Sequence, residues 1–197
     1  MERRFAIIGH RAQSSGKINL NDLAGSSGRI DVLARAVNTA LFLSHGIRDD
    51  TDITLHLQGG PGPARRICFQ GSTLRGVYPD ERAIAGQVGK SLKEPVPAIG
   101  QMVELHSGFL HSGGGVEQTI NEWSRDGVRT FVLDAEGAPF NPDIHISDSM
   151  GFILSDDQPF SESEMKSMEP LEKISLGDVW LQGHVCISIL HHLLDSI

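Results

Sequence analysis

Apolar residues recur at helical spacing in one long stretch near the N-terminus, at Ile30, Leu33, Ala34, Val37, Ala40 and Leu41. Intervals of three and four residues put these side chains on one face of a helix. Ser26 or Ser27 can act as the N-cap, and Gly46 stands where a glycine commonly follows the last helical residue. The pattern therefore predicts a helix from about Gly28 to His45.

Strand-like patterns surround this helix in the first half of the chain. Phe5–Gly9 is an apolar run that is expected to form a buried strand. Ile53–Gln58 alternates between apolar and polar residues, and a Gly/Pro loop separates it from Arg66–Gln70, so the two segments are expected to form a hairpin. A second helix is expected to begin after its N-cap, Asp80, and to run to about Lys93.

The second half of the chain alternates strands with helices. After a short strand and the flexible sequence LHSGGG in residues 103–115, strands are expected within 128–137, 151–158 and 172–178, and helices within 115–127, 161–168 and 183–195. This alternation is typical of an α/β protein with a parallel sheet. Ligands of such sheets gather at the carboxyl ends of the strands. Those ends are Leu133-Asp134, Leu154–Asp156 and Leu176–Asp178. The last helix is apolar on nearly every side, which predicts that it is buried.

Composition narrows the class of protein. The chain has 197 residues, with 39% hydrophobic and 21% charged, which predicts one folded, soluble domain spanning residues 1–197. No apolar run is long enough to span a membrane, and Cys68 and Cys186 are expected to be reduced thiols in a cytoplasmic protein. The net charge of −8 leans towards a small-molecule enzyme, so any RNA contact must come from local arginine clusters. Neither GxGxxG nor GxxxxGK[ST] occurs, so the common dinucleotide and phosphate-loop sites are not expected.

Four segments together resemble a known family. They are LAGSSGRIDVLARAVNTALFLSHGIRDD (Leu23–Asp50), FQGSTLRGVYPDERAIA (Phe69–Ala85), FILSDD (Phe152–Asp157) and ISLGDVWLQGHVCISILHHLLD (Ile174–Asp195). The combination resembles the TrmY family of the SPOUT superfamily, which comprises tRNA pseudouridine-54 N1-methyltransferases and their bacterial relatives. The resemblance extends over nearly the whole chain.

The resemblance implies a fold and a cofactor. The fold would be an α/β SPOUT-type parallel sheet flanked by helices, with a deep C-terminal trefoil knot within about residues 128–197, a rare exception to unknotted topology. The protein would be a homodimer that binds S-adenosyl-L-methionine among the three strand ends. The cofactor-binding residues would be Leu133, Ser155, Leu176, Gly177, Asp178, Val179, Trp180, Leu181 and Cys186. Without the resemblance, ISLGDVWLQG is simply a strand, a turn and the start of a helix.

The reaction implied is methyl transfer to N1 of pseudouridine in tRNA, whose acceptor nitrogen must lose a proton. An arginine can stabilise the resulting anion, and an aspartate can accept the proton or orient the arginine. The catalytic candidates are Asp31, Arg29, Arg35 and Arg82. Asp31, Arg35 and Asn38 follow one another at helical spacing, which predicts a polar stripe opposite the apolar face. The alternative interpretations are a solvated salt bridge between Asp31 and Arg35, and a simple helix cap in the sequence PDER around Arg82.

Other residues limit these expectations. His191 and His192 are adjacent and so point to different faces of a helix, and no metal site is expected. Cys186 is expected to be a packed thiol rather than a nucleophile. Leu105-His106 stand where archaeal members of the family carry an Arg-Arg pair, which removes two phosphate-binding charges. Two alternatives to a tRNA pseudouridine methyltransferase therefore stay open. One is a methyltransferase that acts on another RNA or on a small molecule, and the other is a cofactor-binding or RNA-binding module without catalysis.

Overall fold

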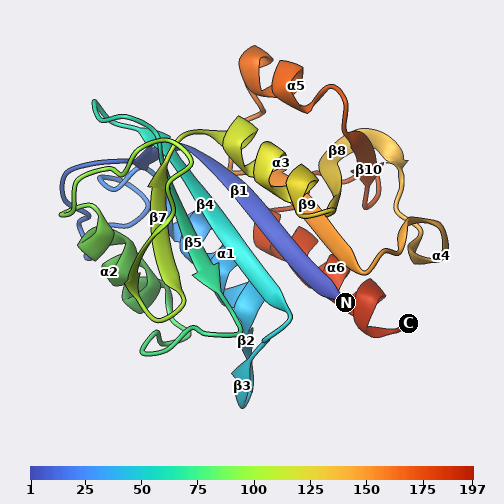
Figure 1. The fold of residues 1–197 in the computed structure, drawn as a ribbon, viewed down its shortest axis with the longest axis horizontal. Coiled ribbons are helices and arrows are strands. Elements are labelled where there is room, and N and C mark those ends of the chain that lie inside the picture. Colours follow the sequence, from blue (N-terminus) through green and yellow to red (C-terminus); the bar gives the residue numbers. More distant parts are fainter.

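The computed structural model describes all residues, 1–197, and its centre is one eight-stranded sheet (Figure 1). The strand order is β10-β8-β9-β1-β4-β5-β7-β6. These strands are β1 (Glu2–Gln13), β4 (Thr51–Gly59), β5 (Arg65–Gln70), β6 (Val103–His106), β7 (Phe109–Gly113), β8 (Arg129–Pro139), β9 (Ser149–Ser155) and β10 (Glu172–Ser175). The helices are α1 (Ile30–Leu41), α2 (Glu81–Ser91), α3 (Val116–Arg125), α4 (Pro142–His145), α5 (Glu162–Met168) and α6 (Gly183–Asp195). A small separate hairpin joins β2 (Phe42–Leu43) to β3 (Gly46–Ile47).

The α/β class is confirmed, but the expectation of a parallel sheet is correct for only part of it. Neighbouring strands are parallel from β10 through β8, β9 and β1 to β4. From β4 through β5 and β7 to β6 they are antiparallel. The difference follows from the connections, because helices join the parallel strands whereas short turns join β4 to β5 and β6 to β7. The segment LHSGGG, expected to be flexible, lies mostly in β7, where β5 and β6 pair with it on either side.

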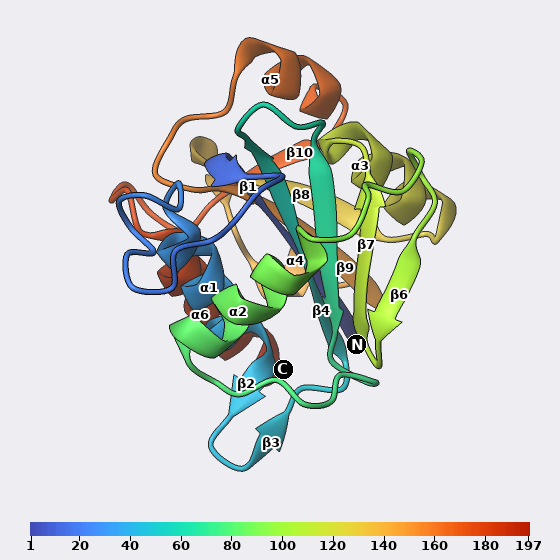
Figure 2. The same cartoon turned by 90° about the vertical axis from the view of Figure 1, so that its left-hand side faces the viewer.

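Helices cover both faces of the sheet. α1, α2 and α6 lie on one face and α3 on the other, as the two perpendicular views show (Figures 1 and 2). β1 therefore has apolar residues on both sides: Phe5 and Ile7 join the larger core beneath α1 and α6, while Ala6 and Ile8 join a smaller core that includes Trp123 of α3. No helix of the structure has both the length and the apolar character that crossing a membrane requires.

The first helix differs from its prediction at both ends. It ends at Leu41 rather than His45, because the Leu41 carbonyl accepts a hydrogen bond from the backbone N–H of Arg48 (2.7 Å) and the chain turns into the β2–β3 hairpin. Gly46 lies in that hairpin. At the other end the N-cap is Arg29, and the Ser27 hydroxyl instead accepts a hydrogen bond from the backbone of Asn19 at 2.8 Å.

The last helix has the predicted ends but not the predicted burial. α6 spans Gly183–Asp195 and buries Ile187, Leu190 and Leu194. Val185, Ile189 and Leu193 are only half-buried. The helix packs against α1, and no further layer of this chain lies over its outer side, so the expectation of an all-round buried helix is wrong for a single chain.

The pairing of β8 with β10 is irregular at the carboxyl edge of the sheet. Lys173 of β10 pairs with Val132 of β8, but the next residue, Ile174, pairs with Ala138. Residues 133–137 therefore arch out of the sheet between two paired sections of β8. Gly137 permits this approach, since a Cβ there would lie 2.7 Å from backbone atoms of Ile174. The arch begins at the strand end that the sequence marks as a ligand-binding edge.

Candidate functional site

A cavity of about 850 Å³ lies at the carboxyl edge of the parallel strands. Its walls are the β8 arch, the segment that follows β9 and the segment between β10 and α6. Arg29 and Val32 of α1 contribute to one side. A volume in this range is typical of pockets for drug-sized ligands and cofactors. The cavity thus lies at the strand ends that the sequence indicates as a ligand-binding edge.

Most of the proposed cofactor-binding residues line this cavity. Those that do are Leu133, Ser155, Leu176, Gly177, Val179, Trp180, Leu181 and Cys186. Asp178 does not, because its side chain is exposed outside the lining at the turn after Gly177. Val179 and Trp180 are 72% and 82% exposed, so they lie at the mouth rather than in the interior.

Cys186 has the character of a packing residue. Its Sγ lies 3.9 Å from the carbonyl oxygen of Leu181, and the residue is half-buried in the cavity lining. Burial raises the pKa of the Cys186 thiol, and a raised pKa disfavours the nucleophilic thiolate.

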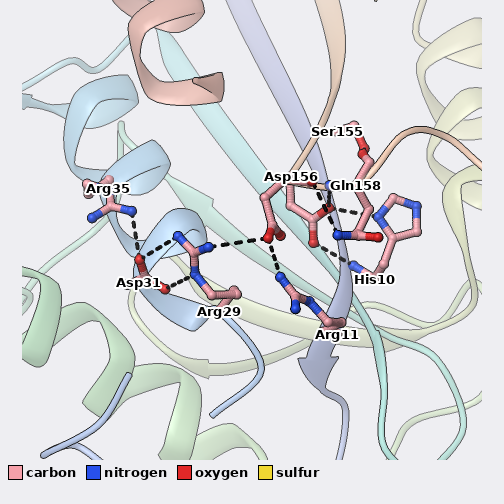
Figure 3. Close-up of polar contacts among 9 residues, drawn as sticks. His10, Arg11, Arg29, Asp31, Arg35, Ser155, Asp156 and Gln158 are labelled. Atoms are coloured by element: carbon pink, nitrogen blue, oxygen red, sulfur yellow. Dashed lines mark hydrogen bonds and ion pairs between the residues drawn. The ribbon is translucent and has the colours of Figure 1, made fainter. Parts of the chain in front are cut away.

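Three of the four proposed catalytic residues form one ion-paired cluster beside the cavity (Figure 3). Arg29 binds Asp31 through two nitrogens, at 3.0 Å and 3.1 Å, and Arg35 donates to the same carboxylate at 2.7 Å. Arg35 also approaches Glu81 of α2, with 3.7 Å between Nη1 and Oε1. Because Arg29 lines the cavity, the cluster is positioned to reach a group bound there.

Asp31 is not part of a solvated stripe. Its side chain is buried, with 6% of the residue exposed, so the interpretation as a solvent-exposed salt bridge is wrong. Burial raises the pKa of the Asp31 carboxyl, but the hydrogen bonds and charge of Arg29 and then Arg35 outweigh burial and leave its pKa below the ordinary value. Asp31 is therefore an anion that holds two guanidinium groups in place.

The backbone of Arg29 has an unusual conformation. With φ 63° it is the one non-glycine residue of the chain in the left-handed region, and it follows Gly28 at φ 65°. A Cβ on Gly28 would lie 1.9 Å from the carbonyl oxygen of Arg11, so this position requires glycine. Such conformations are concentrated at functional sites, where surrounding contacts maintain them.

Arg82 lies apart from this cluster. Its guanidinium donates to the side chain of Asn21 at 3.0 Å and to the Leu20 carbonyl at 3.3 Å, on the exposed side of α2. Asp80 accepts a hydrogen bond from the backbone of Ala83 at 2.8 Å and is the N-cap of α2. The alternative interpretation of PDER as a helix cap is therefore the correct one for Asp80.

The sequence indicates Asp156 only as part of a strand end, and His10 and Asp157 are not among the predicted site residues. Asp156 and Asp157 line the cavity, and Asp157 accepts hydrogen bonds from Arg29 at 3.2 Å and from Arg11. His10 binds Asp156 through both its backbone and its ring. The sequence did contain a signal for these residues, because His10-Arg11 continue the first strand at its carboxyl end just as Asp156-Asp157 follow β9.

The histidines have structural environments. His191 is buried and His192 exposed, as their adjacency predicts, and His106 stacks on Phe109 with 4.8 Å between ring centroids. The structure contains no group of three or more His, Cys, Asp or Glu side chains that could hold a metal ion. Both cysteines are free thiols.

Comparison with known proteins places the chain in a family. A family described as "Putative SAM-dependent RNA methyltransferase" matches residues 2–197. A curated protein of Methanococcus maripaludis named tRNA (pseudouridine(54)-N(1))-methyltransferase is 37% identical over 199 residues, covering 99% of each chain. A protein of the same name from Haloarcula marismortui is 38% identical over 197 residues, covering 98% of this chain and 96% of that one.

A solved structure has the same fold. The crystal structure of Archaeoglobus fulgidus Nep1 bound to S-adenosylhomocysteine matches 99% of this chain and 100% of that chain, with a TM-score of 0.69 and 11% sequence identity. At this identity the likeness concerns the fold alone, whereas the family match spans nearly every residue. The chain therefore belongs to the family of SAM-dependent RNA methyltransferases.

Proposed function

We propose that this protein transfers the methyl group of S-adenosyl-L-methionine to N1 of a pseudouridine in tRNA, at position 54 as in the names of its curated relatives. The observation that carries the proposal is the position of the Arg29–Asp31–Arg35 cluster. A partly buried set of two cations around one anion reaches the wall of a cavity large enough for the cofactor through one member, Arg29.

The cavity fits S-adenosyl-L-methionine in its size and in the chemistry of its walls. Leu133, Leu176 and Leu181 offer apolar surface for an adenine ring, and Ser155 and the backbone around Gly177 offer polar atoms at the strand ends. The cofactor, when bound, supplies a methyl group activated by a positively charged sulfur. The acidic side chains Asp134 and Glu136 along the same lining suit a ligand that carries that charge.

The chain's own residues then have to align the acceptor and stabilise its charge. Methyl transfer of this kind requires an in-line approach of the reacting atoms and little covalent assistance. N1 of pseudouridine becomes more negative as it loses its proton, and the Arg29 guanidinium is the cation best positioned to stabilise that charge. Asp31 orients Arg29 and Arg35. Because its pKa is lowered, Asp31 is a weak base, so we assign it to positioning.

The exposed apolar surface beside the cavity supports a proposal for the assembly. We propose a homodimer in which a second copy covers the exposed Val179 and Trp180 together with the half-buried outer side of α6. We also propose that the segment from β8 to α6 forms the trefoil knot of the family, and that the protein acts in the cytoplasm. Light scattering distinguishes the dimer from the monomer, and Trp180→Glu should shift the equilibrium towards the monomer if the interface is correctly placed.

The function is tested in two steps. Calorimetry with S-adenosylhomocysteine should show binding. Absence of binding would contradict every hypothesis in which the protein is a methyltransferase. Mass spectrometry of tRNA nucleosides from a strain that lacks the gene should then show loss of N1-methylpseudouridine. An unchanged nucleoside profile would contradict the assignment of the acceptor.

One observation favours a different RNA as a second candidate. Leu105-His106 lie on β6, where the family resemblance implies two arginines. His106 packs on Phe109 and lies 3.3 Å from the Gln87 side chain. A chain of net charge −8 without that pair has fewer cations for phosphate contacts. Loss of a methylated nucleoside from ribosomal RNA rather than tRNA in the same experiment would support this second candidate.

A further inference from the structure

One wall of the cavity is attached to a histidine that lies outside the cavity. The segment after β9, from Asp156 to Phe160, lines the cavity and leads into α5. His10, on β1, contacts the first residue of this segment, Asp156 (Figure 3), and also the helix that follows the segment. Its backbone N–H and ring Nδ1 lie 2.9 Å and 2.8 Å from the two oxygens of Asp156, and its ring Nε2 lies 3.0 Å from Glu164 of α5.

The surroundings of His10 favour one protonation state. Each ring nitrogen faces a carboxylate oxygen, and both nitrogens can donate a hydrogen bond only in the imidazolium form. The side chains of Asp156 and Glu164 are 0% and 7% exposed, so solvent offers them little alternative hydrogen bonding. Neutral His10 would leave one of the two carboxylates facing a nitrogen that has no proton to donate, at a cost that burial increases.

We propose that the His10 imidazolium is a positioning residue for the cofactor: it fixes the Asp156–Phe160 wall in the conformation that binds S-adenosyl-L-methionine, and its deprotonation weakens that binding. The inference rests on the proposed function and identifies how the same site is regulated. It follows that methyl-donor affinity depends on pH through a group that does not itself touch the donor.

The neighbouring charged groups support this assignment. Glu164 also accepts hydrogen bonds from Gln58 (2.8 Å) and from the backbone of Ser161 (2.7 Å), so its position does not depend on His10 alone. The next acidic residue, Asp157, is occupied by Arg11 and Arg29 on the other side of the wall. Asp156 and Glu164 are thus the two anions that face the imidazole.

The direction of the pH effect follows from the same contacts. Burial lowers the pKa of His10, but hydrogen bonds and the charges of Asp156 and Glu164 outweigh it, so the pKa is raised above 6.5. The His10 ring therefore donates to both Asp156 and Glu164 at low pH, and one of these two hydrogen bonds is lost as pH rises through this raised pKa. By reciprocity, cofactor binding should raise the pKa of His10 further.

Calorimetry with S-adenosylhomocysteine between about pH 6 and pH 9 tests the proposal, since one unit of pKa difference corresponds to about a tenfold change in affinity. The wild-type dissociation constant should increase by about threefold to tenfold across the His10 titration. His10→Gln should bind S-adenosylhomocysteine weakly, with an affinity that does not change with pH. The control, His192→Gln, changes an exposed histidine of α6 and should keep the wild-type profile.

A second variant keeps the test decisive if His10→Gln does not fold. Glu164→Gln removes one of the two anions while glutamine remains suitable for the capping box of α5. It should move the midpoint of the affinity profile to lower pH. Wild-type binding without pH dependence, or a wild-type profile in His10→Gln, would overturn the inference alone. Absence of wild-type binding at every pH would overturn the proposed function and this inference with it.

Discussion

The parallel and antiparallel parts of the sheet use charged residues in opposite ways. Where β8, β9, β10 and β1 run parallel, their carboxyl ends meet at one edge, and charged groups such as Arg29 and Asp156 border a cavity. Where β4, β5, β7 and β6 run antiparallel, turns close the strand ends, and the charged groups lie inside the fold. Strand direction therefore decides whether charges at a strand end are available to a ligand.

Arg65 and Arg66 illustrate the internal use of charge. Arg66 is fully buried and binds Glu122 of α3 at 2.7 Å and 2.9 Å, with Ser112 and Thr119 completing its contacts. Arg65 donates to three backbone carbonyls, those of Ser14, Ser91 and Glu94, the last at 2.8 Å. These arginines connect the antiparallel strands to neighbouring helices and loops, and none of their contacts faces the cavity.

The largest effect is expected from Arg66→Met. Removing the buried cation leaves Glu122, Ser112 and Thr119 without their partner, which should lower the free energy of unfolding by about 3–5 kcal/mol. Urea denaturation measures this loss. Affinity for S-adenosylhomocysteine, measured on the folded variant, should be unchanged. The exposed Arg125→Ala is the control, and a similar loss of stability there would contradict the comparison.

The next effect concerns the cavity edge. Asp31→Ala should reduce the rate of methyl transfer by about 10²–10³-fold, because Arg29 and Arg35 lose the anion that orients them. Cofactor affinity should stay within about twofold, because Asp31 does not line the cavity. Single-turnover kinetics and calorimetry separate the two quantities. Equal losses of rate and cofactor affinity would show that Asp31 belongs to the cofactor site instead.

A smaller effect is expected from the packing behind the parallel strands. His191 accepts a hydrogen bond from Arg3 (3.0 Å) and donates to the Ala40 carbonyl (3.1 Å), which requires the neutral ring. Burial, with Arg48 and Arg3 adding to it, lowers the pKa of His191 to about 4. Between about pH 6.5 and pH 4, His191 is protonated in the unfolded chain but not in the folded chain. The free energy of unfolding is therefore highest above pH 6.5 and decreases as pH falls to about 4.

Denaturation at several pH values tests this dependence. The contribution of His191 should be on the order of 2 kcal/mol, and His191→Gln should make the decrease with falling pH shallower. His192→Gln, exposed on the same helix, should leave the decrease unchanged. Identical pH profiles for the wild type and His191→Gln would contradict the assignment.

The smallest effect is expected from Arg82→Ala. Arg82 contacts Asn21 and the Leu20 carbonyl and has no contact with the Arg29–Asp31–Arg35 cluster. Methyl transfer should therefore remain within about threefold of the wild-type rate. The largest reduction expected is that from losing one exposed contact with a phosphate of the RNA. A loss as large as that of Asp31→Ala would place Arg82 in the catalytic machinery, and the separation of the two sites would be wrong.

Local sequence signals predicted the helices well and the sheet less well. The Asp80 cap, the ten residues of α3 and both ends of α6 agree with the structure because capping and apolar spacing act within a few residues. The end of α1 was missed because it depends on the Leu41 carbonyl bonding to Arg48 across a hairpin. The antiparallel hairpin of β4 and β5 was predicted from the Gly/Pro loop between them. The direction of β6 and β7 depends on which strands become neighbours, which periodicity does not encode.

The same distinction applies to the site. Strand ends indicated the cavity, and helical spacing indicated the Asp31–Arg35 pair. His10 was missed because its partner, Asp156, is 146 residues away, and only the fold brings the two strand ends together. Asp178 was included because of its place in a motif, whereas in the structure it is exposed and is not among the residues that line the cavity.

The most direct test of the proposed reaction is a methyl-transfer assay with two tRNAs that differ only at position 54, one with pseudouridine and one with uridine. With S-adenosyl-L-methionine as donor, the protein should produce N1-methylpseudouridine in the first tRNA and leave the second unmethylated. Equal methylation of both tRNAs, or of neither while S-adenosylhomocysteine still binds, would contradict the account.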